Sequence, residues 1–194
     1  MSGGFIVVLA ILAFAAVTIF KGVRIVPQGY KWIVQRLGKY HTTLSPGLNF
    51  VIPYVDEVAY KVTTKDIVLD IPSQEVITRD NAVLLMNAVA YINITTPVNA
   101  VYGIENYTWA IQNLVQTSLR SIVGEMDLDD ALSSRDHIKA KLKAAISDDI
   151  SDWGITLKTV EIQDIQPSNT MQAAMEAQAA AERQRRATVT KADG

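Results

Sequence analysis

The longest apolar stretch of the chain lies near its amino end, at residues 5–20, FIVVLAILAFAAVTIF, where Thr18 is the single polar residue. Together with the two preceding glycines it reaches ~27 Å as a helix, which suffices for one membrane crossing when Lys21 extends to the interface. A cleaved signal peptide is the alternative, but the four residues before the stretch include no Lys or Arg. The pattern therefore predicts a retained membrane anchor at residues 1–22.

A shorter period, in which apolar and polar residues alternate, follows the anchor and predicts strands. The expected strands are residues 32–37, 44–55 with a turn at Pro46-Gly47, 61–71 with a break at Pro72-Ser73, and 82–94. The last strand is apolar on nearly both faces, which is typical of a central, buried strand. Residues 23–95 are therefore predicted to form a β-rich region.

The pattern then changes to the spacing of amphipathic helices. Helices are expected at residues 107–124 and 134–153. Gly124 is expected as a left-handed cap of the first, Ser133 and Asp136 as a capping pattern at the start of the second, and Gly154 as its stop.

A strand at residues 155–165 is expected to close the region 96–167, and its apolar residues change side between Leu157 and Val160, which indicates a bulge. After Pro167, Ser168 caps a helix rich in Ala, Gln, Glu and Arg that takes up residues 168–194. This order of elements predicts an α/β or α+β fold.

The composition offers little material for chemistry. Eighteen basic against 20 acidic residues give a net charge of −2, which argues against nucleic acid as the main partner, and there is no cysteine. None of the common catalytic or phosphate-binding motifs occurs. The sequence therefore predicts no catalytic residues, no cofactor and no metal, and the protein is expected not to be an enzyme.

Three smaller features invite a functional interpretation. Asp127, Asp129 and Asp130 lack the glycine and the distal glutamate of a calcium loop, so a solvated turn is expected. His137 is expected to be an exposed residue at a helix start. The N-glycosylation sequons at Asn93 and Asn106 are not expected to be modified in a cytoplasmic domain, which does not meet the glycosylation machinery.

Basic residues after the anchor set its expected orientation. Lys21, Arg24, Lys31, Arg36 and Lys39 all precede the first acidic residue of the chain, at position 56. By the positive-inside rule the carboxyl side faces the cytoplasm, and these cations would lie over anionic headgroups.

Residues 42–55 form an uncharged stretch with several large apolar side chains. Composition alone favours a soluble hairpin core and insertion into the headgroup region equally. Trp32, Tyr30 and Tyr54 are correspondingly either interfacial anchors or core aromatics.

An ordered series of short motifs resembles the stomatin–prohibitin–flotillin–HflK/C (SPFH, or band 7) superfamily, most closely bacterial stomatin-like proteins of the QmcA and paraslipin type. The matching residues are Pro27-Gln28-Gly29-Tyr30, Pro46-Gly47-Leu48, Pro53, Asp70-Ile71-Pro72-Ser73-Gln74-Glu75-Val76, Arg79-Asp80-Asn81-Ala82, Ser134-Arg135-Asp136, Trp153-Gly154-Ile155 and Val160-Glu161-Ile162. The resemblance implies an α+β fold: an anchor at 1–22, a β-rich SPFH subdomain at 23–95, an α/β subdomain at 96–167, and the start of a long coiled-coil helix at 168–194. Residues 191–194 look like the first unit of its Ala-Glu-Gly repeats.

The resemblance also favours membrane contact by the hairpin within residues 42–55, and it implies a non-enzymatic scaffold of the bacterial inner membrane. The scaffold would assemble with itself into a large ring or cage, delimit a membrane microdomain, and have NfeD-type proteins and membrane-bound AAA proteases as partners. A membrane-anchored regulatory or catalytic subunit of a hydrolase or protease complex is the alternative, and a monomeric lipid-binding module is a third.

Two groups of residues are predicted to carry this function. Those expected to contact the membrane are Phe5, Leu9, Leu12, Phe20, Lys21, Arg24, Leu48, Phe50 and Ile52. Those expected to mediate oligomerisation, in the small-residue side of the last helix and its charged flank, are Met171, Ala174, Met175, Ala181 and Arg185.

Overall fold

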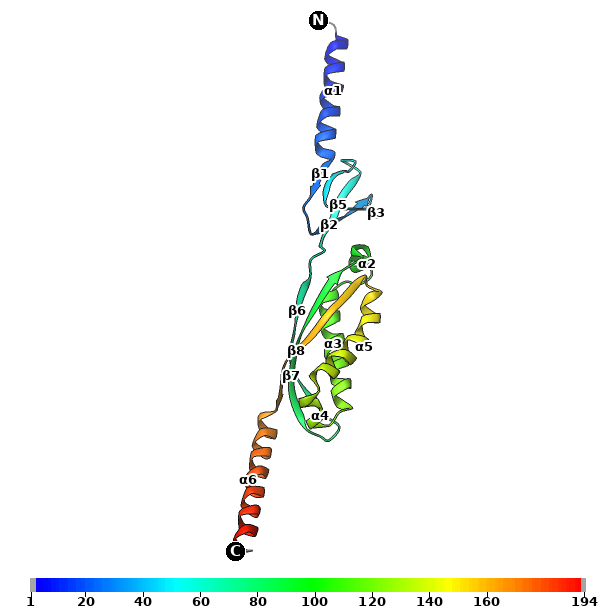
Figure 1. Cartoon of the computed structure of the whole chain (residues 1–194). Helices are drawn as coiled ribbons and strands as arrows, with labels where there is room; N and C mark the ends of the chain where they lie inside the picture. The colour runs from blue at the N-terminus through cyan, green and yellow to red at the C-terminus, as the bar shows by residue number, and fades with distance from the viewer. Residues whose placement is uncertain (1–2, 193–194) are drawn as a thin grey trace. The chain divides into compact units, whose positions relative to one another are not determined.

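The structure is a computed structural model that describes the backbone of residues 3–192 and the side chains of residues 4–186. The chain divides into two compact units (Figure 1). The first combines the amino-terminal part, up to Ile67, with residues 93–105 and 151–156, and the second contains residues 68–92, 106–150 and 157 onward. The predicted repeat unit at residues 191–194 lies outside the described side chains.

The first unit begins with helix α1, Gly3–Gly22, which confirms that the apolar stretch is helical. Strand β1 (Val23–Val26) follows it and pairs antiparallel with β4 (Gly47–Phe50) as a two-stranded ribbon. A separate antiparallel sheet has the order β3-β2-β5, from strands Lys39–Leu44, Tyr30–Arg36 and Asp56–Thr63. The short helix α2, Pro97–Tyr102, also belongs to this unit.

A small apolar core lies within this unit. It consists of Val26, Val34, Leu44 and Val51, with Trp32 and Val58 packed against it. Since strands β1, β2, β3 and β5 and the segment after β4 each contribute a side chain, the core unites residues from 26 to 58.

Two strand predictions in this unit are wrong. Residues 44–55 form no hairpin of their own, because β3 ends at Leu44, β4 ends at Phe50, and the two pair with different strands. Residues 61–71 are divided between β5 and β6 (Ile67–Ile77), and β6 continues through Pro72 instead of stopping there. Pro72 is tolerated because β6 is an edge strand, where one row of backbone N–H groups has no partner strand.

The second unit is built on a sheet of order β6-β7-β8, in which β7 is Val83–Ile94 and β8 is Ile155–Pro167. The central position of β7 confirms the prediction of a central buried strand. Helices α3 (Tyr107–Gly124) and α5 (Arg135–Ser151) lie along one side of the strands (Figure 1). Buried side chains of these elements form the larger core: Leu84, Met86, Ile92, Ile111, Leu119, Ile138, Leu142, Ile146 and Ile150.

Both amphipathic helices are confirmed within two residues, but two predicted end signals are wrong. Gly124 is not left-handed, because the N–H groups of Glu125 and Met126 bond to the carbonyls of Ile122 and Val123 in a tight right-handed turn. Ser133 is the last residue of the unpredicted short helix α4 (Leu128–Ser133), and its hydroxyl donates to the Asp129 carbonyl.

Two other glycine and serine signals are confirmed. Gly154 has φ +68°, and a Cβ at this position would stand 2.5 Å from the Thr96 carbonyl oxygen, so the turn requires glycine. Ser168 caps the last helix, α6 (Asn169–Ala192), since its hydroxyl accepts a hydrogen bond from the Met171 N–H at 3.3 Å. The parity change in β8 is also present, because Leu157 and Val160 are both buried.

Candidate functional site

The β1–β4 ribbon has apolar side chains on both of its faces. Directly opposite residues of an antiparallel pair lie on the same face, and the register pairs Val23 with Phe50 and Ile25 with Leu48. Val26, on the other face, is buried in the core. The exposed fractions are 69% for Ile25, 65% for Leu48 and 68% for Phe50, so the outer face is apolar and uncovered.

The segment from Val51 to Val55 continues this surface towards α1. Val51 turns into the core, and its N–H donates to the Gly22 carbonyl at 2.8 Å. Ile52 and Tyr54 point away from the core and are exposed. The uncharged stretch is therefore mixed: Leu44 and Val51 are core residues, while Leu48, Phe50, Ile52 and Tyr54 are not.

Tyr54 lies against the apolar helix itself. Its ring stacks on that of Phe14, with centroids 6.5 Å apart and planes 5° from parallel. The ammonium group of Lys21 stands 5.9 Å from the centroid of the same ring. Tyr54 has φ +75°, a left-handed conformation that is unusual for a large residue and that sets this turn of the chain.

An ion pair holds the base of this segment. Arg36 donates to both oxygens of the Asp56 carboxylate, at 2.6 and 3.0 Å, and the Ile52 N–H donates to Asp56 Oδ2 at 2.9 Å. The hydrogen bonds from Arg36, and that from Ile52, lower the pKa of Asp56 to about 2 against the opposing effect of burial. The carboxylate is thus ionised at neutral pH and fully occupied by these partners.

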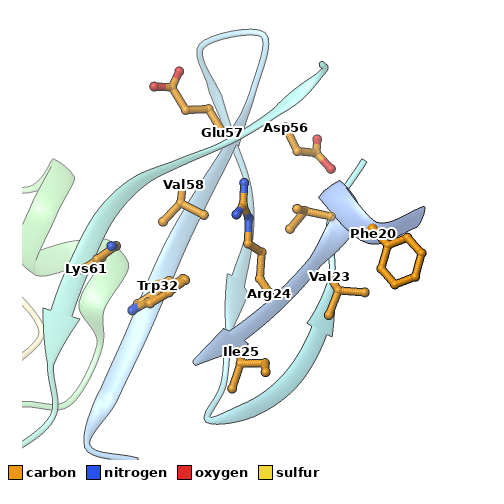
Figure 2. A pocket seen from close by; sticks show the side chains of 10 residues that line it. Phe20, Val23, Arg24, Ile25, Trp32, Asp56, Glu57, Val58 and Lys61 are labelled. Carbon is orange, nitrogen blue, oxygen red and sulfur yellow. The ribbon is translucent and has the colours of Figure 1, made fainter. Parts of the chain in front are cut away.

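A groove opens between the ribbon and strand β5, with a cavity volume of about 820 Å³ (Figure 2). The core residues Trp32, Val51 and Val58 line it, together with Phe20 from the last turn of α1. Arg24 and Lys61 add positive charge, and Lys61 Nζ lies 4.6 Å from the centroid of the Trp32 ring. Trp32 is therefore a core aromatic rather than an isolated interfacial anchor.

Helix α1 is apolar around its circumference. Phe5, Leu9, Leu12 and Phe20 are all exposed, and none of residues 4–21 is buried against the rest of the chain. Its length and composition are sufficient for one membrane crossing. All nine residues predicted to contact the membrane thus lie in α1, β1, β4 or the segment after β4, and all nine are exposed.

The five residues predicted to mediate oligomerisation lie on α6, in the second unit. Met171 is half-buried, whereas Ala174, Met175, Ala181 and Arg185 are exposed. No other described element covers these four side chains.

Several features that invited a chemical interpretation have structural roles. The Asn106 side chain caps α3 by accepting from the Trp109 N–H at 3.0 Å. Asp127 pairs with Arg79, and the carboxylate of Asp80 accepts a hydrogen bond from the Leu128 N–H at the start of α4. Within residues 3–192, no three acidic or histidine side chains gather as a metal-binding group.

Sequence reasoning missed Ile25 as part of the apolar surface. Ile25 stands in the short run Val23-Arg24-Ile25-Val26, where nothing in the sequence says which face it takes, and only the pairing of β1 with β4 sets it beside Leu48. The long spacing between these two strands leaves no local signal for that pairing.

An apolar helix long enough to cross a membrane, followed by a small β unit and a larger unit of sheet and helices, defines a class of α+β proteins with one candidate membrane span. Within that class, this chain belongs to the SPFH domain / Band 7 family, whose model matches residues 24–194. The match confirms the family expected from the motifs.

Similar proteins come from distant organisms. The chain is 36% identical over 191 residues to an uncharacterized protein of Mycobacterium tuberculosis (98% of this chain, 50% of the relative) and 39% identical over 189 residues to an uncharacterized protein of Methanothermobacter thermautotrophicus (97% and 58%). It is 38% identical over 169 residues to mitochondrial stomatin-like protein 2 of Homo sapiens (87% and 48%). The chain spans about half the length of the curated relatives it matches.

Proposed function

We propose that this chain is the membrane-attached part of a non-enzymatic scaffold that assembles with copies of itself into a large ring or cage. The ring organises a membrane microdomain and modulates membrane proteins or membrane proteases. The observation that carries the proposal is the apolar outer face of the β1–β4 ribbon, which continues into a segment stacked on α1. Contiguous exposed apolar surface of this kind marks contact with a membrane or a partner.

The depth of the segment after β4 supports its contact with lipid. Phe14 lies seven residues before Lys21, ~10 Å along the helix axis. The Tyr54 ring lies 6.5 Å from the Phe14 ring and 5.9 Å from the Lys21 ammonium, so with Lys21 at the headgroups it lies where the apolar layer begins. Tyr54 and its neighbour Ile52 enter the membrane beside the helix, and the ribbon lies on the surface.

We infer an orientation with the amino end outside and the domains in the cytoplasm of a bacterial cell, at the inner membrane. The support is the series of basic residues from Lys21, in the last turn of α1, to Lys39, all before the first acidic residue. An alkaline phosphatase fused after residue 194 should show no periplasmic activity, while a cytoplasmic reporter at that position should be active. A strong phosphatase signal would place the domains on the other side.

Assembly is assigned to α6, the expected start of a coiled coil. Identical domains anchored in one plane meet at high effective concentration, and small side chains such as Ala174 and Ala181 allow close approach of a neighbouring helix. Such a contact is heterologous, so it closes a ring rather than a dimer. NfeD-type proteins and membrane-bound AAA proteases are the proposed partners, in addition to lipids and further copies of the chain.

Electron microscopy of the full-length protein in mild detergent tests the scaffold directly. Particles near a megadalton with rotational symmetry are the expected result. A species close to the mass of one chain would instead favour a monomeric lipid-binding module.

A further inference from the structure

The groove between β1 and β5 carries two positive charges that no acidic partner neutralises. Neither Arg24 nor Lys61 forms an ion pair within the part of the chain that the structure describes. The groove carboxylate, Asp56, is already engaged by Arg36 and by the Ile52 N–H. Two cations without an acidic partner therefore line the groove, and such a pair suits an anion.

Strand pairing places both cations on the core-facing sides of their strands. Lys61 is directly opposite Trp32, and Val58 is opposite Val34, so Lys61 shares the face of β5 that packs on the core. A register shift between Ile33 and Val34 makes this possible, because it sets Lys61 and Val58, three residues apart, on one face. Arg24 lies on the face of β1 that also carries the core residue Val26.

The other acidic residue of the lining, Glu57, belongs to the opposite face. Its partner in the register is Gln35, whose side chain bonds to the Tyr102 hydroxyl on α2. Figure 2 shows the Glu57 carboxylate pointing away from Arg24, whose guanidinium extends from β1 towards β5. Glu57 therefore does not compete for the cations.

The apolar part of the lining lies next to the end of the membrane helix. Phe20, from the last turn of α1, and Val23 and Ile25 of β1 line the groove beside the two cations. Its volume of about 820 Å³ is within the range that holds a small ligand. A ligand with an anionic head and an adjacent apolar body matches this arrangement.

We propose that the groove binds the phosphodiester group of an anionic phospholipid, with Arg24 and Lys61 as its ligands and the acyl chains running along Phe20 and Ile25. A guanidinium fork and an ammonium group on one phosphate give charge-assisted hydrogen bonds. A cation–π contact with the Trp32 ring positions the Lys61 ammonium group. The assignment rests on the proposed membrane attachment, because it sets the groove at headgroup level.

The experiment uses the full chain in an uncharged detergent, with Trp109 and Trp153 replaced by Phe so that Trp32 alone reports. Titration with soluble dihexanoyl-phosphatidylglycerol should change the Trp32 fluorescence, at an affinity at least about tenfold higher than for dihexanoyl-phosphatidylcholine. Arg24→Gln and Lys61→Gln should each weaken the phosphatidylglycerol affinity about tenfold, the effect of one charge-assisted hydrogen bond. Circular dichroism of both variants confirms that they are folded.

The matched control is Lys39→Gln, which removes an exposed cation of β3 outside the groove and should change the affinity less than about twofold. Equal affinity for the two lipids, or an equal loss in Lys39→Gln, would overturn the proposal, because either indicates diffuse attraction. Inorganic phosphate that binds as tightly as phosphatidylglycerol would also overturn it, in favour of a free-anion site.

Liposome flotation of the same variants separates this proposal from the scaffold. The titration uses no bilayer, so it does not depend on attachment to a membrane, and Lys61→Gln, outside the residues predicted to contact the membrane, should still float with α1 in place. Normal flotation with no lipid preference refutes the groove only, whereas failure of the unmodified chain to float refutes the membrane attachment.

Discussion

The β1–β4 ribbon and the β6-β7-β8 sheet obey the same alternation of side chains but differ in what covers them. In the sheet, Leu84, Met86 and Ile92 of β7 are buried in the same core as side chains of α3 and α5. In the ribbon, Val26 reaches a core on one face, while Ile25, Leu48 and Phe50 on the other face are left uncovered. Alternation marks apolar faces in both regions, but other parts of the chain cover that face in the β6-β7-β8 sheet and leave the outer face of the β1–β4 ribbon exposed.

The two regions also differ in how their exposed apolar residues are arranged. Exposed apolar residues also occur in the second unit, at Val68, Ile77, Tyr91 and Trp109, but they come from different strands and a helix. Those of the ribbon are cross-strand neighbours and continue into Ile52 and Tyr54. Single exposed apolar residues are ordinary on protein surfaces, whereas a contiguous set next to an apolar helix indicates a surface that something else covers.

The largest expected effect concerns α6, where apolar and small side chains are also uncovered. Arg at both Ala174 and Ala181 should convert large particles into small species, because two buried charges would separate neighbouring helices. Electron microscopy and size-exclusion chromatography measure the change, and membrane attachment should be intact.

The matched control is Arg at both Ala173 and Ala180, which have the same seven-residue spacing about 100° away on the helix. If the particle size of the first variant is unchanged, the assembly contacts lie in the two units or in a coiled coil beyond α6.

A second prediction compares how exposed apolar residues of the ribbon and of β6 contribute to liposome binding, in a chain shortened to residues 23–194. Leu48→Asp with Phe50→Asp should weaken liposome binding by a few kcal/mol, from ~1.5–3 kcal/mol for each large apolar side chain withdrawn from water. Val68→Asp with Ile77→Asp, at similarly exposed positions of β6, should leave flotation unchanged. If circular dichroism instead shows that the first variant is unfolded, Leu48 and Phe50 are core residues and the membrane interpretation is wrong.

A third prediction concerns stability rather than binding. Leu119→Ala, in the core of the second unit, should lower the free energy of unfolding by about 2–5 kcal/mol, since it removes buried methyl groups and leaves a cavity. Leu48→Ala should change it by less than about 0.5 kcal/mol, because its side chain is exposed. Urea titration followed by circular dichroism compares them, and similar losses would mean that the ribbon face is covered in the folded monomer.

The smallest effect is the pH dependence of the Arg36–Asp56 pair. The pKa of Asp56 is lowered from 3.8 to about 2 in the fold, so its stabilisation is present above about pH 4 and is lost as the pH falls through about 2. The melting temperature of Asp56→Asn should therefore vary less between pH 5 and pH 2 than that of the unmodified chain. The matched change Asp127→Asn, in the exposed pair with Arg79, should have a smaller effect on stability at neutral pH. An unaltered pH profile in Asp56→Asn would show that other carboxylates dominate acid unfolding.

Local signals predicted the elements that depend on near neighbours in the chain. Helix α1, both amphipathic helices and the Ser168 cap arise from spacings of three to seven residues, and the structure has them where they were expected. Pro72 was wrongly expected to end a strand, because its effect depends on whether the strand is central or at an edge of the sheet. Gly124 was wrongly expected to be left-handed, because a right-handed turn satisfies the last helix carbonyls instead. Both outcomes depend on neighbours that the local sequence does not specify.

The exposed apolar surface of the ribbon was predictable only in part for the same reason. Residues 42–55 are uncharged and rich in apolar side chains, but their composition fits a soluble core and a membrane contact equally well. The pairing of β4 with β1, rather than with β3, sends Leu48 and Phe50 to the outer face, and the Arg36–Asp56 pair holds Ile52 and Tyr54 beyond it.

The sequence by itself determined the apolar helix, the two amphipathic helices, the family and the supply of basic residues from Lys21 onward. Each of these depends on composition or on short spacings, which are properties of a local segment. Tertiary structure alone decided which apolar faces are covered and that Arg24 and Lys61 line one groove, because a side chain's face follows from its strand's partner and register. A change of one residue in register reverses every face of a strand, so these features appear only once distant segments have paired.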